Sequence, residues 1–285
     1  MPTPTVRRLQ LGNELRHARE AVGHTVEDAA VVIERTSSTI SRLEHGQTGI
    51  RQRDLADLLR SYGAGVALIE QLAELARNNS QRGRWSGYRR AYPGWFRMFV
   101  DMEEDATSLL HFGSEVVPGL LQTEDYIRTL LSTGLANTPD DRVENAVQAR
   151  LLRQAVLTKQ GAPRAGFVLS ESALRRVVGD ARILRDQLAH LAEIALLPNV
   201  QLQVLPFDAP SFGVALFGFT LVRIPAPGSA GPLDFVYLED YIDARYHDDK
   251  ADVEAYTALW HRVQAAALGP VESRALVLEV AGSVT

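Results

Sequence analysis

The sequence predicts a mostly helical chain in two parts, a five-helix N-terminal domain followed by an α+β domain. Up to about residue 78, apolar side chains recur at helical spacing and glycines separate the successive helical patterns. From about residue 108, apolar runs typical of strands occur among further helices without strict alternation, which favours α+β. We therefore expect domains over residues 1–79 and 98–285, joined by a connecting segment over residues 80–97.

Three amphipathic helices are predicted around a central helix-turn-helix pattern. They cover about residues 7–22, 52–62 and 66–78, and Gly23 and Gly63 end the first two. Their apolar positions are Leu11, Leu15, Ala18, Val22, Leu55, Leu58, Leu59, Leu68, Ile69, Leu72 and Leu75. These stripes can share one small core.

The helix-turn-helix pattern occupies residues 24–46. Thr25 and Asp28 have the spacing of a capping box, so a second helix is expected to begin there. The turn is predicted at residues 34–35, and Thr36 is expected to cap the third helix.

The third helix has the features of a recognition helix for the DNA major groove. It is expected to bury Ile40 and Leu43 and to expose Ser37, Ser38 and Arg42. Hydroxyl groups can hydrogen-bond several base edges, and arginine can reach guanine O6 and N7. The alternative is an ordinary helical hairpin in a core.

The segment Ser37–Gly46 resembles the most specific part of the lambda-repressor-like domain in the xenobiotic-response-element (XRE) family of regulators. The resemblance implies that the three exposed residues just named touch DNA bases. It also implies a structural ion pair between Arg19 of the first helix and Glu44 of the third.

Charge is distributed unevenly along the chain, whose net charge is −5. Residues 1–80 are neutral, residues 81–97 carry five arginines and no acid, and residues 98–285 carry 15 basic and 25 acidic residues. A neutral DNA-binding domain implies few phosphate contacts and modest affinity per copy, which favours a homodimer. The candidate DNA backbone contacts are Thr25, Thr36, Thr39, Arg51 and Arg53.

An aromatic run follows the first domain, with members Trp85, Tyr88, Tyr92, Trp95, Phe96 and Phe99. Its spacing is helical, and Pro93 is expected to start a helix within it. Interleaved arginines also permit a surface on which nucleic-acid bases stack. We favour packing against a core, which would join the two domains.

In the second domain, strands are predicted near residues 109–116, 166–169, 200–205, 216–224 and 235–238. Helices are predicted over about 124–131, 138–159, 172–178, 183–194, 249–268 and 272–280. Residues 241–249 are interpreted as a polar loop whose last acids begin a helix.

Several segments of this domain, Val117–Thr123, Ser172–Arg176, Gln187–Leu191, Val200–Phe207 and Val236–Glu239, resemble the C-terminal domain of actinobacterial WhiJ-like or antitoxin-like regulators. The resemblance implies a transcription factor that works with a small partner protein encoded nearby. A small-molecule effector is a further expectation for this domain.

Other classes of protein lack support. The chain has no cysteine, no apolar run of membrane-spanning length and no signal-peptide pattern, so a cytoplasmic location without membrane association is expected. The acids and histidine of residues 243–249 match no standard metal spacing, and no phosphate-binding or nucleophile motif occurs. We expect no enzyme activity, cofactor or metal. The sequence thus predicts a regulator that binds double-stranded DNA, and the alternative is an antitoxin-like protein that sequesters a partner and regulates its own operon.

Overall fold

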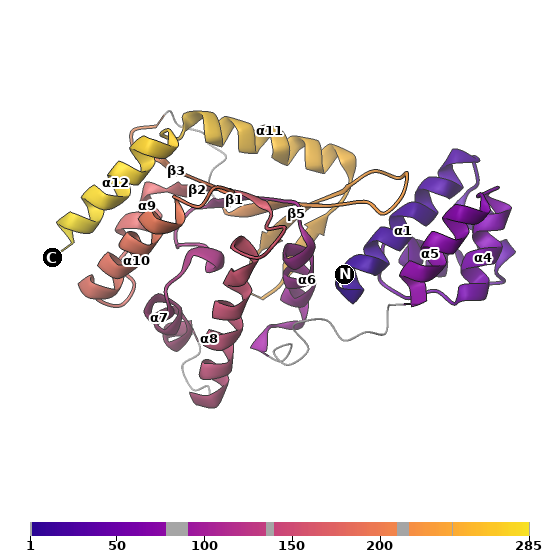
Figure 1. The fold of residues 1–285 in the computed structure, drawn as a ribbon, viewed down its shortest axis with the longest axis horizontal. Coiled ribbons are helices and arrows are strands. Elements are labelled where there is room, and N and C mark those ends of the chain that lie inside the picture. The colour runs from indigo at the N-terminus through magenta and orange to yellow at the C-terminus, as the bar shows by residue number, and fades with distance from the viewer. Residues whose placement is uncertain (1, 78–90, 135–139, 210–216, 241, 285) are drawn as a thin grey trace. The chain divides into compact units, whose positions relative to one another are not determined.

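The computed structural model describes residues 2–77, 91–134, 140–209, 217–240 and 242–284 (Figure 1). It divides into two compact units, each described by itself. Besides the N-terminal helices, the first unit contains residues 98–105 and 224–233, and the second contains residues 88–97, 106–223 and 234–285. The second of these segments lies far along the chain from the N-terminal helices.

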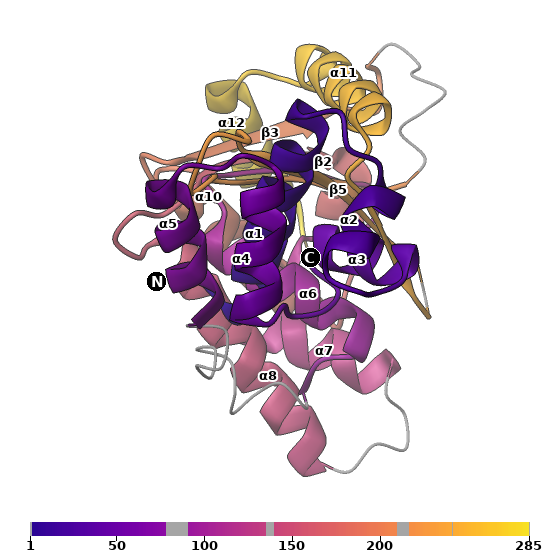
Figure 2. The same ribbon diagram turned by 90° about the vertical axis from the view of Figure 1, so that its right-hand side faces the viewer.

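The N-terminal helices confirm the predicted five-helix arrangement (Figure 2). They are α1 Pro4–Ala21, α2 Val26–Val32, α3 Ser37–Glu44, α4 Gln52–Ser61 and α5 Val66–Arg77. α1 begins earlier than predicted because the Thr3 hydroxyl accepts a hydrogen bond from the Val6 amide and caps the helix there. The shared core consists of Leu11, Leu15, Ala29, Ala30, Ile33, Ile40, Leu43, Leu55, Leu58, Leu59, Tyr62 and Leu72.

Two glycines allow α1 and α3 to pack closely. A Cβ atom at Gly12 would collide with the carbonyl oxygens of Leu43 and Glu44 at the end of α3. Gly46 follows α3 with φ of 66°, and a Cβ atom there would come within 2.8 Å of the Leu9 amide nitrogen. A side chain at either position would therefore force the two helices apart.

α6, which spans Arg97–Asp105, contributes to the first unit through polar contacts with the start of α1. The Thr5 hydroxyl donates to Asp101 Oδ2 at 2.5 Å, and the Thr3 amide donates to Asp105 Oδ2 at 2.6 Å. These carboxylates face the N-terminus of α1, where negative charge is favoured by the helix dipole.

The described part of the second unit contains a six-stranded sheet in the order β3-β2-β1-β4-β5-β6. The strands are β1 Ser108–Gly113, β2 Arg164–Ser170, β3 Val200–Leu205, β4 Phe219–Ile224, β5 Leu233–Glu239 and β6 Ala244–His247. β2 pairs in parallel with β1 and β3, whereas β1–β4 and β5–β6 are antiparallel pairs. This mixed sheet among helices confirms the predicted α+β class.

Helices cover both faces of the sheet (Figure 1). α11 lies on one face, where Leu259, Trp260 and Val263 pack against Phe112 and Val168. The remaining helices are α7 Glu124–Gly134, α8 Asp140–Gln154, α9 Glu171–Arg175, α10 Ala181–Ile194, α11 Lys250–Ala266 and α12 Pro270–Ser283, with 3-10 turns η3 Gly94–Phe96, η4 Gly119–Leu121 and η5 Ala155–Leu157.

The outer edge of β3 is closed by the connection between α11 and α12. The Leu268 amide donates to the Val204 carbonyl at 2.9 Å, and the Val204 amide donates to the Ser273 hydroxyl at 2.9 Å. Gln203 Nε2 donates to the Leu268 carbonyl at 2.8 Å. These bonds satisfy backbone groups that would otherwise offer an edge for another strand.

Some predicted boundaries are wrong. Residues 244–247 form β6 rather than a loop, because backbone pairing with β5 and a 5.2 Å ring contact between Tyr237 and Tyr246 hold them. α9 ends at Arg175, and α12 is longer at both ends than predicted. The start of the predicted strand at residue 216 lies outside the described residues.

Tyr92, Trp95 and Phe96 of the aromatic run lie in the second unit, whereas Phe99 is buried in the first. Tyr92 and Phe96 have ring centroids 5.4 Å apart, and Phe96 lies 6.1 Å from the Tyr237 ring. Pro93 immediately precedes the η3 turn, which leads directly into α6, so a helical segment begins there as predicted, with Pro93 at the N-cap rather than at the first helical position. Trp85 and Tyr88 lie outside the described residues, and the predicted joining of the two domains stays a prediction.

Candidate DNA-binding surface

α2 begins with the predicted capping box. The Asp28 amide donates to Thr25 Oγ1 at 3.1 Å, and the Thr25 amide donates to Asp28 Oδ2 at 2.9 Å. The bond from the Thr25 amide, together with a 2.8 Å bond from the Thr25 hydroxyl, keeps the pKa of Asp28 below its usual value. A phosphate contact by the Thr25 hydroxyl would therefore have to replace its bond to Asp28.

The turn between α2 and α3 contains a left-handed residue. Glu34 has φ of 54°, the one positive value found for a residue other than glycine in the described chain. The Arg35 amide then donates to the Ala30 carbonyl at 2.9 Å and closes the turn. This conformation redirects the chain so that α3 packs on α1 and α2.

α3 divides its side chains between core and solvent as predicted. Ile40 and Leu43 are buried, Ser38 and Arg42 are exposed, and Ser37 is half-buried. Arg42 Nε donates to the Ser38 carbonyl at 3.3 Å, so the guanidinium lies along the helix surface. Of the three predicted base-contacting residues, Ser38 and Arg42 are exposed as expected, whereas Ser37 lies at the edge of the buried face.

Hydroxyl groups cluster at the start of α3. Thr36 Oγ1 lies 2.9 Å from Ser38 Oγ and 3.0 Å from Thr39 Oγ1. Thr36 occupies the N-cap position, but the prediction that its side chain caps the helix is wrong, since it makes no bond to the α3 backbone. The cluster instead presents three hydroxyls at a helix N-terminus, where phosphate groups are favoured.

The pair of Arg19 and Glu44 is present and buried. Arg19 Nε and NH2 donate to the two carboxylate oxygens of Glu44 at 2.6 and 2.9 Å, and NH1 donates to the His24 carbonyl at 2.7 Å. The bonds to Glu44 raise the pKa of Arg19. Burial, helped by the charge of Glu44, raises the pKa of the nearby Tyr62 to about 12. This pair fixes α3 against α1.

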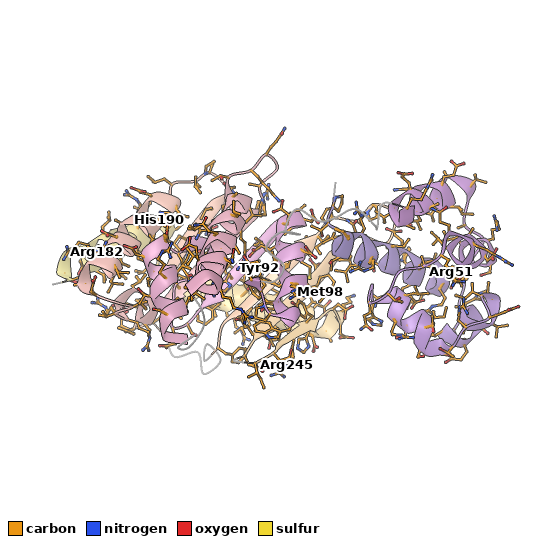
Figure 3. All side chains as sticks on the ribbon, turned by 90° about the horizontal axis from the view of Figure 1, so that it is seen from below. Arg51, Tyr92, Met98, Arg182, His190 and Arg245 are labelled. Carbon is orange, nitrogen blue, oxygen red and sulfur yellow. The ribbon has the colours of Figure 1, made fainter. Side chains whose placement is uncertain are left out.

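Arg51 and Arg53 are exposed at the start of α4, and Arg51 is labelled in Figure 3. Arg53 Nε is 3.7 Å from Asp57 Oδ2, a loose ion pair that leaves the guanidinium accessible. Both side chains can reach a ligand in solvent. A role as phosphate contacts stays a prediction.

Two polar residues of α1 make hydrogen bonds that the sequence did not predict. Gln10 and Glu14 are buried and bind the backbone of residues 225–230 within the first unit. In the sequence they look like ordinary surface positions of an amphipathic helix. Their role depends on a segment more than 200 residues away.

The acids and histidine near residue 247 have local roles. His247 Nδ1 lies 2.8 Å from Asp252 Oδ2, and Asp249 caps α11 by accepting from the Ala251 amide. Among the described residues, no three His, Asp or Glu side chains come together as a metal site. No helix in the described ranges is long and apolar enough to span a membrane.

Two family models match the chain, one in its N-terminal part and one over most of the remainder. A family described as a helix-turn-helix domain matches residues 10–72, which include α2 and α3. A family described as a domain of unknown function, DUF5753, matches residues 96–279. No curated protein and no solved structure is significantly similar to the chain.

Proposed function

The chain belongs to the DUF5753 family and carries a helix-turn-helix domain, and on this premise we propose that it is a sequence-specific transcriptional regulator. The observation that carries the proposal is the anchored α3. One side of this helix is fixed by its apolar core and by the pair of Arg19 and Glu44. The other side presents Ser38 and Arg42 to solvent, and this is what readout of a major groove requires.

The proposed base contacts are Ser37, Ser38 and Arg42. Thr36, Thr39, Arg51, Arg53 and Thr25 are the proposed contacts to the DNA backbone, with Thr25 subject to the competition from Asp28 described above. The pattern of α3 resembles that of XRE regulators, which favours docking of its N-terminal half into the groove.

The second unit is proposed to bind an effector or a partner rather than to catalyse a reaction. Its resemblance to WhiJ-like regulators supports this proposal. A neutral N-terminal domain has limited affinity for DNA, so we also propose that the full chain acts as a homodimer inside the cell.

A gel-shift experiment tests the proposal. The full chain is titrated into DNA from directly upstream of its own gene, with random DNA as competitor. We expect a complex that resists random competitor, and equal binding to both DNAs would contradict sequence-specific regulation. Purification of the chain from its native host is a second test. A small partner protein that co-purifies in stoichiometric amount would favour the antitoxin-like alternative.

A further inference from the structure

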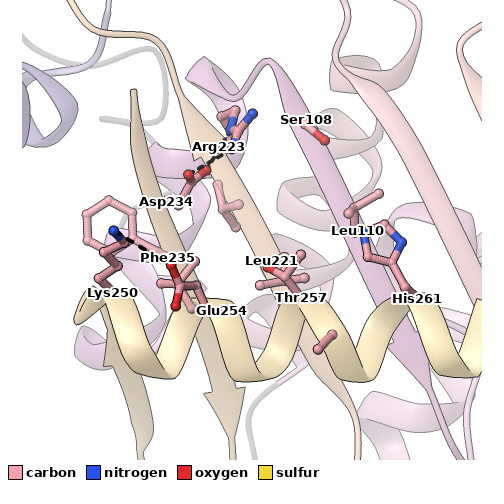
Figure 4. A pocket seen from close by; sticks show the side chains of 13 residues that line it. Ser108, Leu110, Leu221, Arg223, Asp234, Phe235, Lys250, Glu254, Thr257 and His261 are labelled. Carbon is pink, nitrogen blue, oxygen red and sulfur yellow. Dashed lines mark hydrogen bonds and ion pairs between the residues drawn. The ribbon is translucent and has the colours of Figure 1, made fainter. Parts of the chain in front are cut away.

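A cavity of about 670 Å³ opens between α11 and the sheet within the second unit (Figure 4). Leu259, Trp260 and Val263 of α11 pack into the core on one face of the sheet. The neighbouring stripe of the helix borders the cavity and follows the helical repeat: Lys250, Val253, Glu254, Thr257, Ala258 and His261. Leu110 of β1 and Leu221 of β4 line the opposite wall.

The chemistry of the wall favours an uncharged occupant. Arg223 donates two hydrogen bonds to Asp234 at 2.7 and 2.9 Å, and Lys250 Nζ lies 3.8 Å from Glu254 Oε1. The arginine and lysine that line the cavity are thus each matched by an acid. These pairs offer an ionic ligand no excess charge to bind, whereas the apolar part of the wall favours an uncharged one. The remaining wall is largely apolar, with the hydroxyls of Ser108 and Thr257 and the imidazole of His261 as its other polar groups.

The pair of Arg223 and Asp234 also lies where the loop between β4 and β5 begins and ends. Arg223 is the next-to-last residue of β4, and Asp234 is the second residue of β5. The pair therefore lines the cavity and also closes the base of the loop formed by residues 225–232. An occupant that moves this pair also moves the base of the loop.

The same loop binds α1 within the first unit. Glu14 is only 1% exposed, and its Oε1 accepts from the Gly228 amide at 3.0 Å and the Ala230 amide at 3.3 Å. Gln10 Nε2 donates to the Pro225 carbonyl at 2.7 Å, and Asn13 Nδ2 donates to the Gly231 carbonyl at 3.3 Å. α1 in turn holds α3 through Arg19. A continuous series of contacts thus runs from the loop to the recognition helix.

We propose that the cavity binds a small, uncharged, largely apolar effector and that the 225–232 loop couples its occupancy to DNA binding. The binding step stands on the cavity alone, whereas the coupling rests on the proposed function. An effector changes DNA affinity only if it favours one arrangement of the loop over another. An occupant that shifts the pair of Arg223 and Asp234 as a unit, without breaking its hydrogen bonds, would provide such a preference.

The cavity is tested with the uncharged dye Nile red, whose fluorescence rises in apolar surroundings. The full chain is expected to bind it saturably, and Ala258→Trp is expected to weaken binding at least tenfold by filling the cavity. Ala255→Trp is the matched control, because Ala255 is exposed on α11 but does not border the cavity. Equal dye binding by the wild type and Ala258→Trp would overturn the site. Conversion of a dimer to a monomer by Ala258→Trp would also overturn it, since a second copy would then occupy this face.

The coupling is tested by DNA affinity with and without saturating dye. We expect the dissociation constant for the upstream DNA to change by about fivefold or more, within the range typical of allosteric coupling. Glu14→Gln should abolish this change while leaving dye binding intact. An unchanged dissociation constant in the wild type would overturn the coupling. A chain that binds the dye but no DNA would instead contradict the proposed function and leave the cavity assignment supported.

Discussion

The guanidinium of Arg19 on α1 holds the carboxylate of Glu44 on α3 with two hydrogen bonds of 2.6 and 2.9 Å. The two side chains are only 9% and 4% exposed, so water competes weakly for these bonds. The bidentate geometry fixes the direction of α3 as well as its distance from α1. Orientation of the exposed side chains of α3 thus depends on a pair that itself points inward.

Arg19→Met should strongly destabilise the first unit. Removal of one partner leaves the Glu44 charge buried without compensation, at a typical cost of about 3–5 kcal/mol. Urea unfolding of the full chain, followed by circular dichroism, measures the loss. Arg60→Met is the control, because Arg60 pairs with Asp57 at the surface and should cost less than about 1 kcal/mol. Equal stability of the wild type and Arg19→Met would contradict a structural role.

Arg42→Ala should reduce affinity for the cognate DNA site by about 1–3 kcal/mol, the usual value of an arginine that reads a base. Affinity for random DNA should fall much less. Fluorescence anisotropy with the two DNAs makes the comparison, and Arg262→Ala on α11 controls for the lost charge. Equal losses on both DNAs would identify Arg42 as a phosphate contact.

Glu34 is expected to tolerate glycine but not valine. Its φ of 54° suits glycine, whereas a β-branched side chain is strongly disfavoured there. Glu34→Gly should change the free energy of unfolding by less than about 1 kcal/mol, and Glu34→Val should lower it by about 1–2 kcal/mol or more. Thermal unfolding of both variants provides the measurement. A turn that accepts valine without loss would show that the left-handed conformation is not required.

His111 should make the second unit sensitive to acid. Its burial, with a smaller effect of the Arg153 charge, lowers its pKa to about 4, and its Nδ1 lies 2.7 Å from Thr220 Oγ1. Between about pH 6.5 and pH 4, the unfolded chain binds a proton that the folded chain does not, so stability falls as the pH falls. Because the side chain keeps some exposure, we expect a loss of about 1–3 kcal/mol.

Urea midpoints at pH 7 and pH 5 should therefore differ less in His111→Gln than in the wild type. His17→Gln is a suitable control, since His17 is exposed on α1. If all three proteins lose stability equally between these pH values, His111 does not contribute to the acid sensitivity.

The full chain should be a dimer at micromolar concentration. Two linked copies raise the affinity of a neutral DNA-binding domain, and their half-sites should lie about one helical turn apart in a near-palindrome. We expect the main dimer contacts to lie outside residues 1–80. A protein that consists of residues 1–80 alone should therefore be monomeric. Light scattering of both proteins tests the two statements. A monomeric full chain that protects a single half-site would refute the dimer.

Local patterns in the sequence determined most of the first unit. The capping box of Thr25 and Asp28, the apolar spacing of Ile40 and Leu43, and the left-handed turn at Gly46 are each visible within one helix or one turn, whereas the close contact of Gly46 with α1 is not. Their effects depend on neighbours at fixed spacing, so the sequence contains the necessary information. The pairing of Arg19 with Glu44 came from a family resemblance, and the structure supplies its geometry.

Only the tertiary structure decided the contacts between distant segments. Glu14 binds a loop more than 200 residues away, and β6 forms because β5 and Tyr237 are already in place beside it. The cavity forms where one stripe of α11 packs into the core and the neighbouring stripe borders the opening. Hydrophobic spacing specifies which face of an element is buried, but the choice of partner for that face depends on the packing of the whole unit.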